Sequence, residues 1–349
     1  MTTEILKIDP AQIDSSELAI KSAAEIIKNG GLVVFPTETV YGLGADATNS
    51  VAAKKIYSAK GRPSDNPLII HIAKPADAEN YTYTSDIYYC LAERFMPGPL
   101  TVIMDAKDSI PNETRGGLST VAVRCPENPI ARRLISLAGV PIAAPSANVS
   151  GSPSPTNASH VIDDMMGRVD MIIDGGECDF GLESTIVKIE NDGSLTLLRP
   201  GKITPEALSE VARVNIADAV LDRLPDGEVA LSPGMKYRHY APKSPVVLLD
   251  GDISRLIAHI SSDNDDNIAV ICYSDDVREL KSALPGYDFY EFGSRDDEIA
   301  QAHSLFRLLR DLDKRNYTKI YAPLPKKEGI GLALYNRMIR AAAHRIIKL

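Results

Sequence analysis

Residues 31–44 read Gly-Leu-Val-Val-Phe-Pro-Thr-Glu-Thr-Val-Tyr-Gly-Leu-Gly. Within this stretch, residues 32–35 form a continuous apolar run between glycines and a proline, a pattern typical of a strand buried on both faces. The hydroxyl groups of Thr37 and Thr39 follow where the chain leaves the sheet. The two later glycines allow a tight turn or a close approach of the backbone to a ligand. The stretch therefore predicts a buried strand that ends in a polar, glycine-rich turn.

A predicted helix over residues 51–59 separates this turn from two cations. A side chain at residues 49–50 can cap the start of the helix, and Gly61 can end it in the left-handed conformation. Lys60 and Arg62 flank that end, and two fixed cations beside a hydroxyl-rich turn suit a phosphate. A purely structural interpretation stays open, because a lysine also suits the dipole of a helix C-terminus and an arginine can be solvated.

Length and composition indicate a globular protein with room for two domains. The chain has 349 residues, of which 44% are hydrophobic and 24% are charged. Its apolar runs are far shorter than a membrane span, and its first ten residues show no signal-peptide pattern. The four cysteines lie far apart without a CxxC pair, and the six histidines lack metal-ligand spacing. We therefore expect a cytoplasmic protein without a disulfide framework or structural zinc site.

The charge is distributed unevenly along the chain. The net charge is −9, and residues 1–207 hold 18 Lys and Arg against 26 Asp and Glu, which leaves −8. An acidic first half is a poor sequence-independent binder of polyanions. Any role in nucleic-acid binding would therefore need a local basic groove.

Strands and helices alternate irregularly through residues 1–207, which predicts a mixed twisted sheet with helices packed against it. The expected strands are 32–35, 68–72, 100–104, 120–124, 141–144, 171–173, 185–189 and 195–198. The expected helices are 17–29, 51–59, 86–95, 129–137, 157–166 and 204–214.

The helical pattern weakens over residues 215–244, and residues 231–242 have no amphipathic period. Residues 208–244 are therefore predicted to be an ordered interdomain linker. The segment 232–242 is too rich in Tyr, His and Arg for a flexible spacer, so we expect it to be ordered and to act as a lid. Residues 245–349 alternate four strands with four helices, which predicts a small parallel three-layer, Rossmann-like α/β domain. The expected strands are 246–249, 268–272, 288–292 and 320–322, and the expected helices are 253–260, 277–284, 298–312 and 331–347.

Four polar clusters fall near predicted strand ends of the first domain, where ligands collect in open α/β sheets. They are Thr37/Thr39/Tyr41, Lys60/Arg62/Asn66, Thr120/Arg124 and Ser146/Asn148. Each has a structural alternative, since a Ser–Asn pair can form a turn and an arginine can pair with a surface carboxylate. Three cations with hydroxyls and amides, and without an obvious nucleophile–base pair, indicate binding of a phosphate ester more than acyl-enzyme chemistry.

The same motifs closely resemble the YrdC domain family. The resemblance is carried by Phe-Pro-Thr-Glu-Thr-Val-Tyr-Gly-Leu-Gly, the Lys60-x-Arg62 pair with Pro-Ser-Asp-Asn-Pro-Leu, Pro97-Gly98-Pro99-Leu100-Thr101, Val123-Arg124 and Ser146-x-Asn148. The later motifs Ser184-Thr185-Ile186-Val187, Arg199-Pro200-Gly201, Ser-Pro-Gly-Met-x-x-x-His-Tyr-Ala-Pro and Gly-x-Gly-x-Ala match its long, two-domain form, the threonylcarbamoyl-adenylate synthases. The resemblance covers essentially the whole chain.

This resemblance implies an enzyme that converts L-threonine, bicarbonate (or CO₂) and ATP into threonylcarbamoyl-AMP and pyrophosphate. A separate transferase would pass the product to the tRNA adenosine next to the anticodon, so direct tRNA binding is expected to be weak or absent. Mg²⁺ is the implied cofactor, but its protein ligands are not identified by the sequence.

The resemblance also assigns residues to the two substrates. Lys60 and Arg62 are the implied catalytic residues. The positions expected near ATP are Lys60, Arg62, Asn66, Thr120, Ser146, Asn148, Ser154, Arg199 and, from the linker, Tyr240. The positions expected near threonine are Thr39, His71, Arg124, Ala144 and Ser184.

Other functions stay open at this stage. A hydrogenase maturation factor also carries a YrdC-like domain, but it would need a zinc-finger segment for which this chain lacks the cysteines. A non-catalytic RNA-binding module is the alternative from another class, and the acidic first half argues against it. A scaffold that uses only the second domain leaves the polar motifs of the first domain unexplained.

Overall fold

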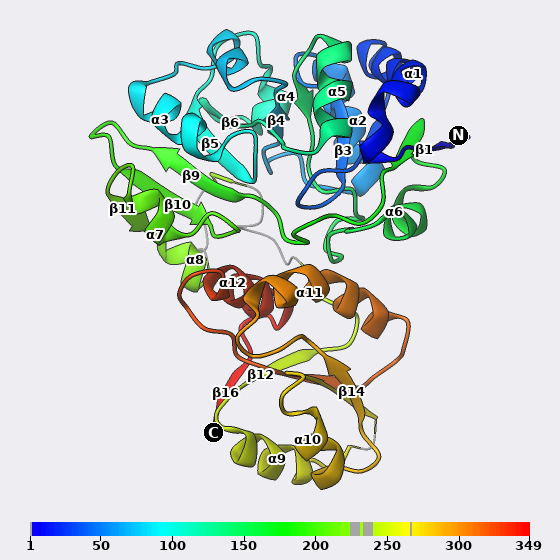
Figure 1. The fold of residues 1–349 in the computed structure, drawn as a ribbon, viewed down its shortest axis with the longest axis vertical. Helices are drawn as coiled ribbons and strands as arrows, with labels where there is room; N and C mark the ends of the chain where they lie inside the picture. The colour runs from blue at the N-terminus through cyan, green and yellow to red at the C-terminus, as the bar shows by residue number, and fades with distance from the viewer. Residues whose placement is uncertain (1, 224–230, 233–239, 266) are drawn as a thin grey trace. The chain divides into compact units, whose positions relative to one another are not determined.

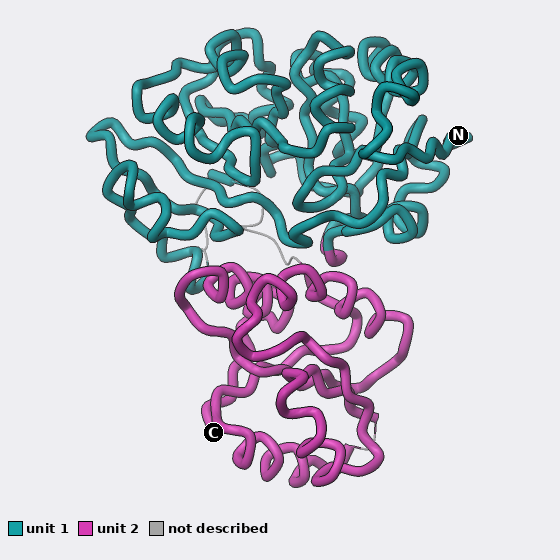
Figure 2. Tube along the Cα trace, in the orientation of Figure 1, with its two compact units in different colours: residues 1–150, 154–236 teal, residues 151–153, 237–349 magenta. Residues whose placement is uncertain are grey.

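The structure is a computed structural model that describes residues 2–223, 231–232, 240–265 and 267–349 (Figure 1). The chain divides into two compact units (Figure 2). Unit 1 comprises residues 1–150 and 154–236, and unit 2 comprises residues 151–153 and 237–349. The linker and lid predicted over residues 208–244 lie partly outside the described residues, so most of the predicted lid, 233–239, has no structural account here.

In the described part of unit 1, eleven strands form one sheet. Their order is β1 (Glu4–Lys7), β8 (Met171–Asp174), β2 (Val33–Phe35), β3 (Gly42–Asp46), β7 (Ile142–Ala143), β4 (Ile69–His71), β6 (Thr120–Arg124), β5 (Leu100–Asp105), β9 (Thr185–Ile189), β10 (Leu195–Arg199) and β11 (Val214–Ile216). The sheet contains parallel pairs such as β4/β6 and β5/β9 and antiparallel pairs such as β2/β3 and β5/β6. The predicted mixed sheet is confirmed.

The helices of unit 1 follow the predicted pattern closely. They are α1 (Glu17–Lys28), α2 (Ser50–Lys60), α3 (Asp86–Phe95), α4 (Asn112–Arg115), α5 (Pro129–Ala138), α6 (Ala158–Met165), α7 (Pro205–Ser209) and α8 (Asp218–Leu221), with 3₁₀ turns at Pro10–Ser16 and Pro75–Asn80. The Asn49 side chain accepts hydrogen bonds from two backbone N–H groups at the start of α2. Gly61 ends α2 with φ +62°, in the left-handed region that glycine tolerates best.

The core of unit 1 forms where α1 and α5 pack on the sheet. Ile20 and Ile27 of α1 and Leu134 of α5 are buried against Phe35 of β2. Because each helix places its apolar side chains on one face, both helices can cover the strand without exposing it. This packing buries the strand that ends in the polar turn.

Several elements of unit 1 differ from the prediction. β1, α4 and α8 were not predicted. β3 is a strand although glycines make its sequence a weak strand former, because it pairs with β2 and β7. The helix predicted over 204–214 ends at Ser209, and the chain continues into β11, which pairs with β10. Beyond β11, side chains of residues 217, 219 and 231 pack on a core cluster that includes Ile69 and Ile186.

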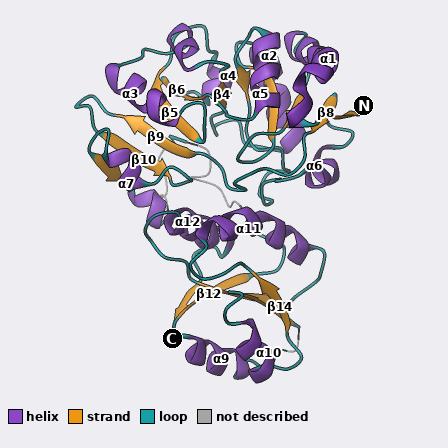
Figure 3. Cartoon of the chain, in the orientation of Figure 1, coloured by secondary structure: helices purple, strands orange, loops and turns teal. Residues whose placement is uncertain are grey.

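Unit 2 is a three-layer α/β domain. Its described strands form a parallel sheet in the order β14 (Asp288–Glu291), β13 (Ile268–Cys272), β15 (Lys319–Pro323), β12 (Val246–Asp250) and β16 (Ile346–Lys348). Figure 3 shows α9 (Ile253–Ser261) and α10 (Val277–Ala283) on one face of the sheet, and α11 (Glu298–Asp313) and α12 (Gly331–Ala341) on the other. The predicted parallel Rossmann-like architecture is confirmed.

The end of unit 2 differs from the prediction. The helix expected over 331–347 stops at Ala341, and Ala343 and His344 adopt positive φ angles of 49° and 61°. The chain then forms β16 beside β12. No glycine or proline marks this break in the sequence, so strand pairing overrides the local helical pattern.

The packing of residues beyond 207 predicts where unit 1 can be truncated. A chain that ends at residue 207 loses β11, α8 and the fully buried Val220, whereas a chain that ends at residue 232 keeps them. Because burial of one such side chain stabilises by roughly 1.5–3 kcal/mol, we expect the shorter chain to unfold with a free energy lower by about 2 kcal/mol or more. Urea denaturation of the two fragments measures the difference, and equal midpoints would contradict it.

Candidate active site

The side chain of Lys60, at the end of α2, contacts the loop that follows β7. Its side chain is buried, and Nζ donates to the backbone oxygen of Ser146 and, at 2.6 Å, to that of Asn148. Within the loop, Ser146 Oγ donates to Asn148 Oδ1 at 2.5 Å. The backbone N–H of Ser150 in turn donates to the oxygen of Lys60. Three residues that were predicted near ATP from distant parts of the sequence are therefore in direct contact.

The Arg62 side chain binds backbone carbonyls of the loop that follows α2. Its Nη2 donates to the oxygen of Pro67 at 3.1 Å, and its Nε donates to the oxygen of Asn66 at 3.4 Å. Asn66 is buried, and its side-chain Oδ1 has no hydrogen-bond partner among the described residues. A buried amide oxygen without a partner is unfavourable, so this acceptor is suited to a donor on a ligand.

The polar turn after β2 contains a second group of contacts. The Thr37 hydroxyl donates to the oxygen of Val40 at 2.7 Å, so in its 2.9 Å contact with Thr39 it must accept and Thr39 must donate. Both hydroxyls are buried. The backbone oxygen of Thr39 accepts from the N–H of Gly181, which places the loop before β9 against this turn.

Arg124, the last residue of β6, forms a buried ion pair with Glu38 of the same turn. Arg124 Nη2 donates to Glu38 Oε1 at 2.6 Å, and about 5% of each side chain is exposed. Glu38 was not among the predicted site residues. The alternative interpretation, that Arg124 pairs with a carboxylate on the surface, is wrong. Arg124 does pair with a carboxylate, but that of Glu38 is buried in the turn after β2. The missed signal was the acidic residue between the two threonines, since a buried arginine needs an anion.

His71, at the end of β4, lies in register with Arg124 on the neighbouring strand. Its Nδ1 lies 3.3 Å from the backbone oxygen of Ile142, so Nδ1 carries the proton and Nε2 is left as an acceptor. Burial, and then the charge of Arg124, lower the pKa of His71 to about 3. The imidazole is therefore neutral at physiological pH.

Ser184 and Arg199 meet across the β9–β10 hairpin. Arg199 Nη2 donates to Ser184 Oγ at 3.1 Å, and its Nε donates to the backbone oxygen of Ser184 at 3.0 Å. Ser184 Oγ also lies 2.7 Å from the hydroxyl of Thr101, which is in register with Arg124 on β6. A residue predicted near threonine and one predicted near ATP are therefore hydrogen-bonded to each other.

The remaining predicted residues occupy separate places. Ser154 is buried and donates to the carboxylate of Glu183, which was not among the predicted site residues. Ala144 follows β7, and its N–H donates to the oxygen of Ile69. Tyr240 belongs to unit 2, where its ring stacks on Phe306 with a centroid distance of 5.1 Å.

Thr120 and Arg124 were grouped as one cluster, and this grouping is wrong. They are the first and last residues of β6. Four residue steps along a strand separate them by about 13 Å, so they cannot hold the same chemical group. They can still contact different parts of an extended ligand.

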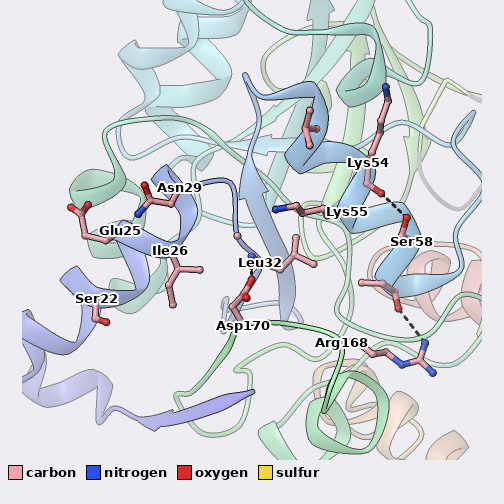
Figure 4. A pocket seen from close by; sticks show the side chains of 13 residues that line it. Ser22, Glu25, Ile26, Asn29, Leu32, Lys54, Lys55, Ser58, Arg168 and Asp170 are labelled. Carbon is pink, nitrogen blue, oxygen red and sulfur yellow. Dashed lines mark hydrogen bonds between the residues drawn. The ribbon is translucent and has the colours of Figure 1, made fainter. Parts of the chain in front are cut away.

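The large groove between α1 and α2 is a different feature of unit 1. Its volume is about 1080 Å³, and none of the predicted site residues lines it. Figure 4 shows cations along it, but Lys55 Nζ donates to the oxygen of Gly30 at 2.6 Å and Arg168 donates to the oxygen of Ala59. These cations bind carbonyls at the ends of helices and thereby stabilise the fold.

The described residues contain no group of three or more His, Cys, Asp or Glu side chains arranged to hold a metal ion. None of their helices combines the length and apolarity that a bilayer crossing requires.

The low pKa of His71 predicts a dependence of stability on pH. In the unfolded chain a histidine titrates near 6.5, so between pH 3 and 6.5 the unfolded state binds the extra proton. The contribution of His71 to stability is therefore complete above pH 6.5 and falls as the pH falls. From pH 6.5 to 5.5 the wild-type chain should lose about 1 kcal/mol more unfolding free energy than His71→Gln, as measured by urea denaturation. Parallel pH profiles of the two proteins would contradict the assignment.

Comparison with known proteins identifies the family. A family model described as "Telomere recombination" matches residues 25–201, and one described as "Threonylcarbamoyl-AMP synthase, C-terminal domain" matches residues 203–343. Proteins named threonylcarbamoyl-AMP synthase from Pyrococcus abyssi and Bacillus subtilis are 42% and 40% identical to this chain. These alignments cover 95% and 97% of this chain, respectively, and 96% of each relative.

A solved structure agrees with these sequence matches. The crystal structure of P. abyssi Sua5 complexed with L-threonine superposes with a TM-score of 0.88 and 40% sequence identity, and the alignment covers 100% of both chains. Since both domain models and full-length relatives match, the chain belongs to the threonylcarbamoyl-AMP synthase family, in its two-domain form.

Proposed function

We propose that the chain is an L-threonylcarbamoyladenylate synthase, a nucleotidyltransferase that converts L-threonine, bicarbonate (or CO₂) and ATP into threonylcarbamoyl-AMP and pyrophosphate. The observation that carries the proposal is the full-length match to relatives that bear this name, at 40% identity or more. The relative crystallised with L-threonine supports threonine as the amino acid.

The proposed reaction has two steps. The amino group of threonine adds to bicarbonate with loss of water, which gives a carbamate. A carbamate oxygen then attacks the α-phosphorus of ATP as the bond to the β-phosphate oxygen breaks, and pyrophosphate leaves. A carbamate is a weak, short-lived nucleophile, so the enzyme must chiefly align the reactants and neutralise charge.

The residues around Lys60 are suited to the nucleotide. We assign Lys60 and Arg62 to the phosphates and the attacking carbamate, because both cations lie where α2 meets polar loops. The further ATP-binding positions in the proposal are Asn66, Thr120, Ser146, Asn148, Ser154, Arg199 and Tyr240. Asn66 supports this assignment through its buried, unpartnered amide oxygen.

The residues around Arg124 are suited to threonine. The proposed positions are Thr39, His71, Arg124, the backbone of Ala144, and Ser184. The separation of Thr120 from Arg124 along β6 supports an arrangement in which nucleotide and amino acid bind toward opposite ends of the strand. Ser184 would then lie where the two substrates meet, because it contacts both Arg199 and Thr101.

Mg²⁺ is the proposed cofactor and would neutralise phosphate charge and assist departure of pyrophosphate when bound. Mg²⁺ commonly keeps several waters and binds through substrate phosphates with few protein ligands. The described residues, which offer no cluster of three His, Cys, Asp or Glu ligands, fit an ion that arrives with ATP.

The proposed product is an unstable mixed anhydride, so a downstream transferase must consume it and carry the threonylcarbamoyl group to tRNA. We propose a cytoplasmic location, and we propose that this chain itself binds tRNA weakly or not at all. The acidic balance of residues 1–207 supports this last point.

The experiment that tests the function is pyrophosphate release from ATP by the full chain. Release should require both L-threonine and bicarbonate, and threonylcarbamoyl-AMP should accumulate with it. A non-catalytic RNA-binding module would instead retain tRNA on a filter without ATP and release no pyrophosphate.

Arg62 gives the first prediction from this function. Arg62→Ala should lower kcat/KM for ATP by roughly 10²–10³, because it removes a positioned donor to developing charge. Lys54→Ala is the matched control, since it removes an exposed cation of the neighbouring helix α2 that pairs with Glu113. If Arg62→Ala keeps more than about half of the activity that Lys54→Ala keeps, the assignment of Arg62 is wrong.

The amino-acid pocket gives the second prediction. Threonine differs from serine by one methyl group, which a shaped apolar pocket discriminates by roughly 10- to 200-fold. We therefore expect kcat/KM for threonine to exceed that for serine by a factor in this range, measured by pyrophosphate release. Equal values for the two amino acids would mean that the pocket is misplaced.

A further inference from the structure

Glu38 is held at both of its carboxylate oxygens. Oε1 accepts from Arg124 Nη2 at 2.6 Å, and Oε2 accepts from the backbone N–H groups of Glu127 at 3.1 Å and Asn128 at 3.4 Å. The side chain is buried, and the backbone oxygen of Glu38 accepts from the N–H of Phe180. Glu38 therefore connects the turn after β2, the end of β6 and the start of α5, and cannot rotate without breaking several hydrogen bonds.

Arg124 is held by this contact at only one of its nitrogens. A guanidinium carries five N–H donors in a planar fork. Among the described residues the Arg124 side chain donates one hydrogen bond, from Nη2 to Glu38, and its buried Nε has no partner. Leaving a buried donor of a charged group unpaired is costly, so a vacant donor on a fixed guanidinium points to an acceptor supplied by a ligand.

The surroundings of this donor indicate the chemical class of that acceptor. His71, in register with Arg124, is neutral, and the buried hydroxyl of Thr39 follows Glu38 in the same turn. The Glu38–Arg124 pair is itself neutral overall, so it offers little attraction to a multiply charged phosphate. A planar carboxylate with two oxygens matches the edge of a guanidinium fork.

We propose that Glu38 is a positioning residue that holds Arg124 through Nη2, so that the Nε side of the guanidinium binds the α-carboxylate of the amino-acid substrate. This proposal deepens the proposed function and rests on it for the identity of that amino acid. Glu38 acts through Arg124 and does not itself contact the substrate.

The substitution Glu38→Gln tests the proposal with little change in shape. A carboxylate accepts at both oxygens, but an amide has only one acceptor oxygen. Whichever way the amide lies, its NH₂ group faces either Arg124 or the two backbone N–H groups. Either the hydrogen bond to Arg124 or the backbone contacts that anchor the side chain are therefore lost, and in both cases Arg124 is held less firmly. Glu38→Asp keeps the charge but is shorter, so it should restore part of the function.

The readout is binding of L-threonine and of L-threoninamide, which lacks the carboxylate, to the full chain by calorimetry. Glu38→Gln should weaken threonine binding by roughly 10- to 100-fold and raise its KM similarly, the size of effect seen when a group that orients a ligand is removed. Binding of threoninamide and the KM for ATP should stay within about twofold of wild type. Glu38→Asp should give an intermediate affinity for threonine.

Glu17→Gln is the matched control, because it changes a carboxylate to an amide in the exposed Glu17–Arg133 pair of the same unit. It should leave both affinities unchanged. Equal weakening of threonine and threoninamide by Glu38→Gln, or an unchanged threonine affinity, would overturn the proposal. If circular dichroism shows that Glu38→Gln does not fold, Glu38→Asp is tested in its place. It too must weaken binding of threonine more than binding of threoninamide.

Failure of the proposed function would be seen separately. Wild-type chain that releases no pyrophosphate with threonine and bicarbonate would refute the synthase activity, whereas the preference for threonine over threoninamide would still report on Glu38. Conversely, an active wild type with an unaffected Glu38→Gln variant would refute only the role of Glu38.

Discussion

The buried ion pair between Glu38 and Arg124 is the interaction on which this site depends. Removing one member of such a pair leaves an uncompensated charge in a low dielectric and typically destabilises by about 3–5 kcal/mol. Here the carboxylate also accepts from the backbone at the start of α5, so the same side chain fixes a turn, a strand end and a helix start. A polar turn after a buried strand thereby becomes a rigid part of the fold.

The second constraint near this turn is steric, because there is no room for a side chain at Gly44. A Cβ atom at Gly44 would lie 2.7 Å from side-chain atoms of both Ile142 and Phe35. Such contacts are too short, so a side chain at this position would push β3 away from its neighbours. This explains why β3 pairs between β2 and β7 although its sequence favours a turn. The same close packing brings the turn against the loop that contains Ser146, through the bridge between Gly42 and Ser146.

Most of the fold could be predicted where local pattern and tertiary packing agree. The strand Thr120–Arg124 and the helix Asp86–Phe95 have the predicted bounds, because apolar periodicity and the flanking Ser, Pro and Gly residues mark them. β16 could not be predicted, since its residues continue a helical pattern and only pairing with β12 makes them a strand. In the site, the cations and hydroxyls stand out by composition, but Glu38 and the Arg199–Ser184 contact depend on which strands become neighbours.

At the Arg124 end of the site, one buried basic side chain is neutral and the other is charged. Burial disfavours the charged imidazolium of His71, and the nearby Arg124 guanidinium repels it as well, so the pKa of His71 is lowered and the ring is neutral. The buried positive charge of Arg124 is balanced by the carboxylate of Glu38. The result is a region with hydrogen-bond donors and acceptors but little net charge. An amino-acid zwitterion has the same character, since its ammonium and carboxylate cancel, whereas a triphosphate does not. Under the proposed function, this charge balance would favour an amino acid at the Arg124 end, and the cations at the end of α2 would bind the phosphates.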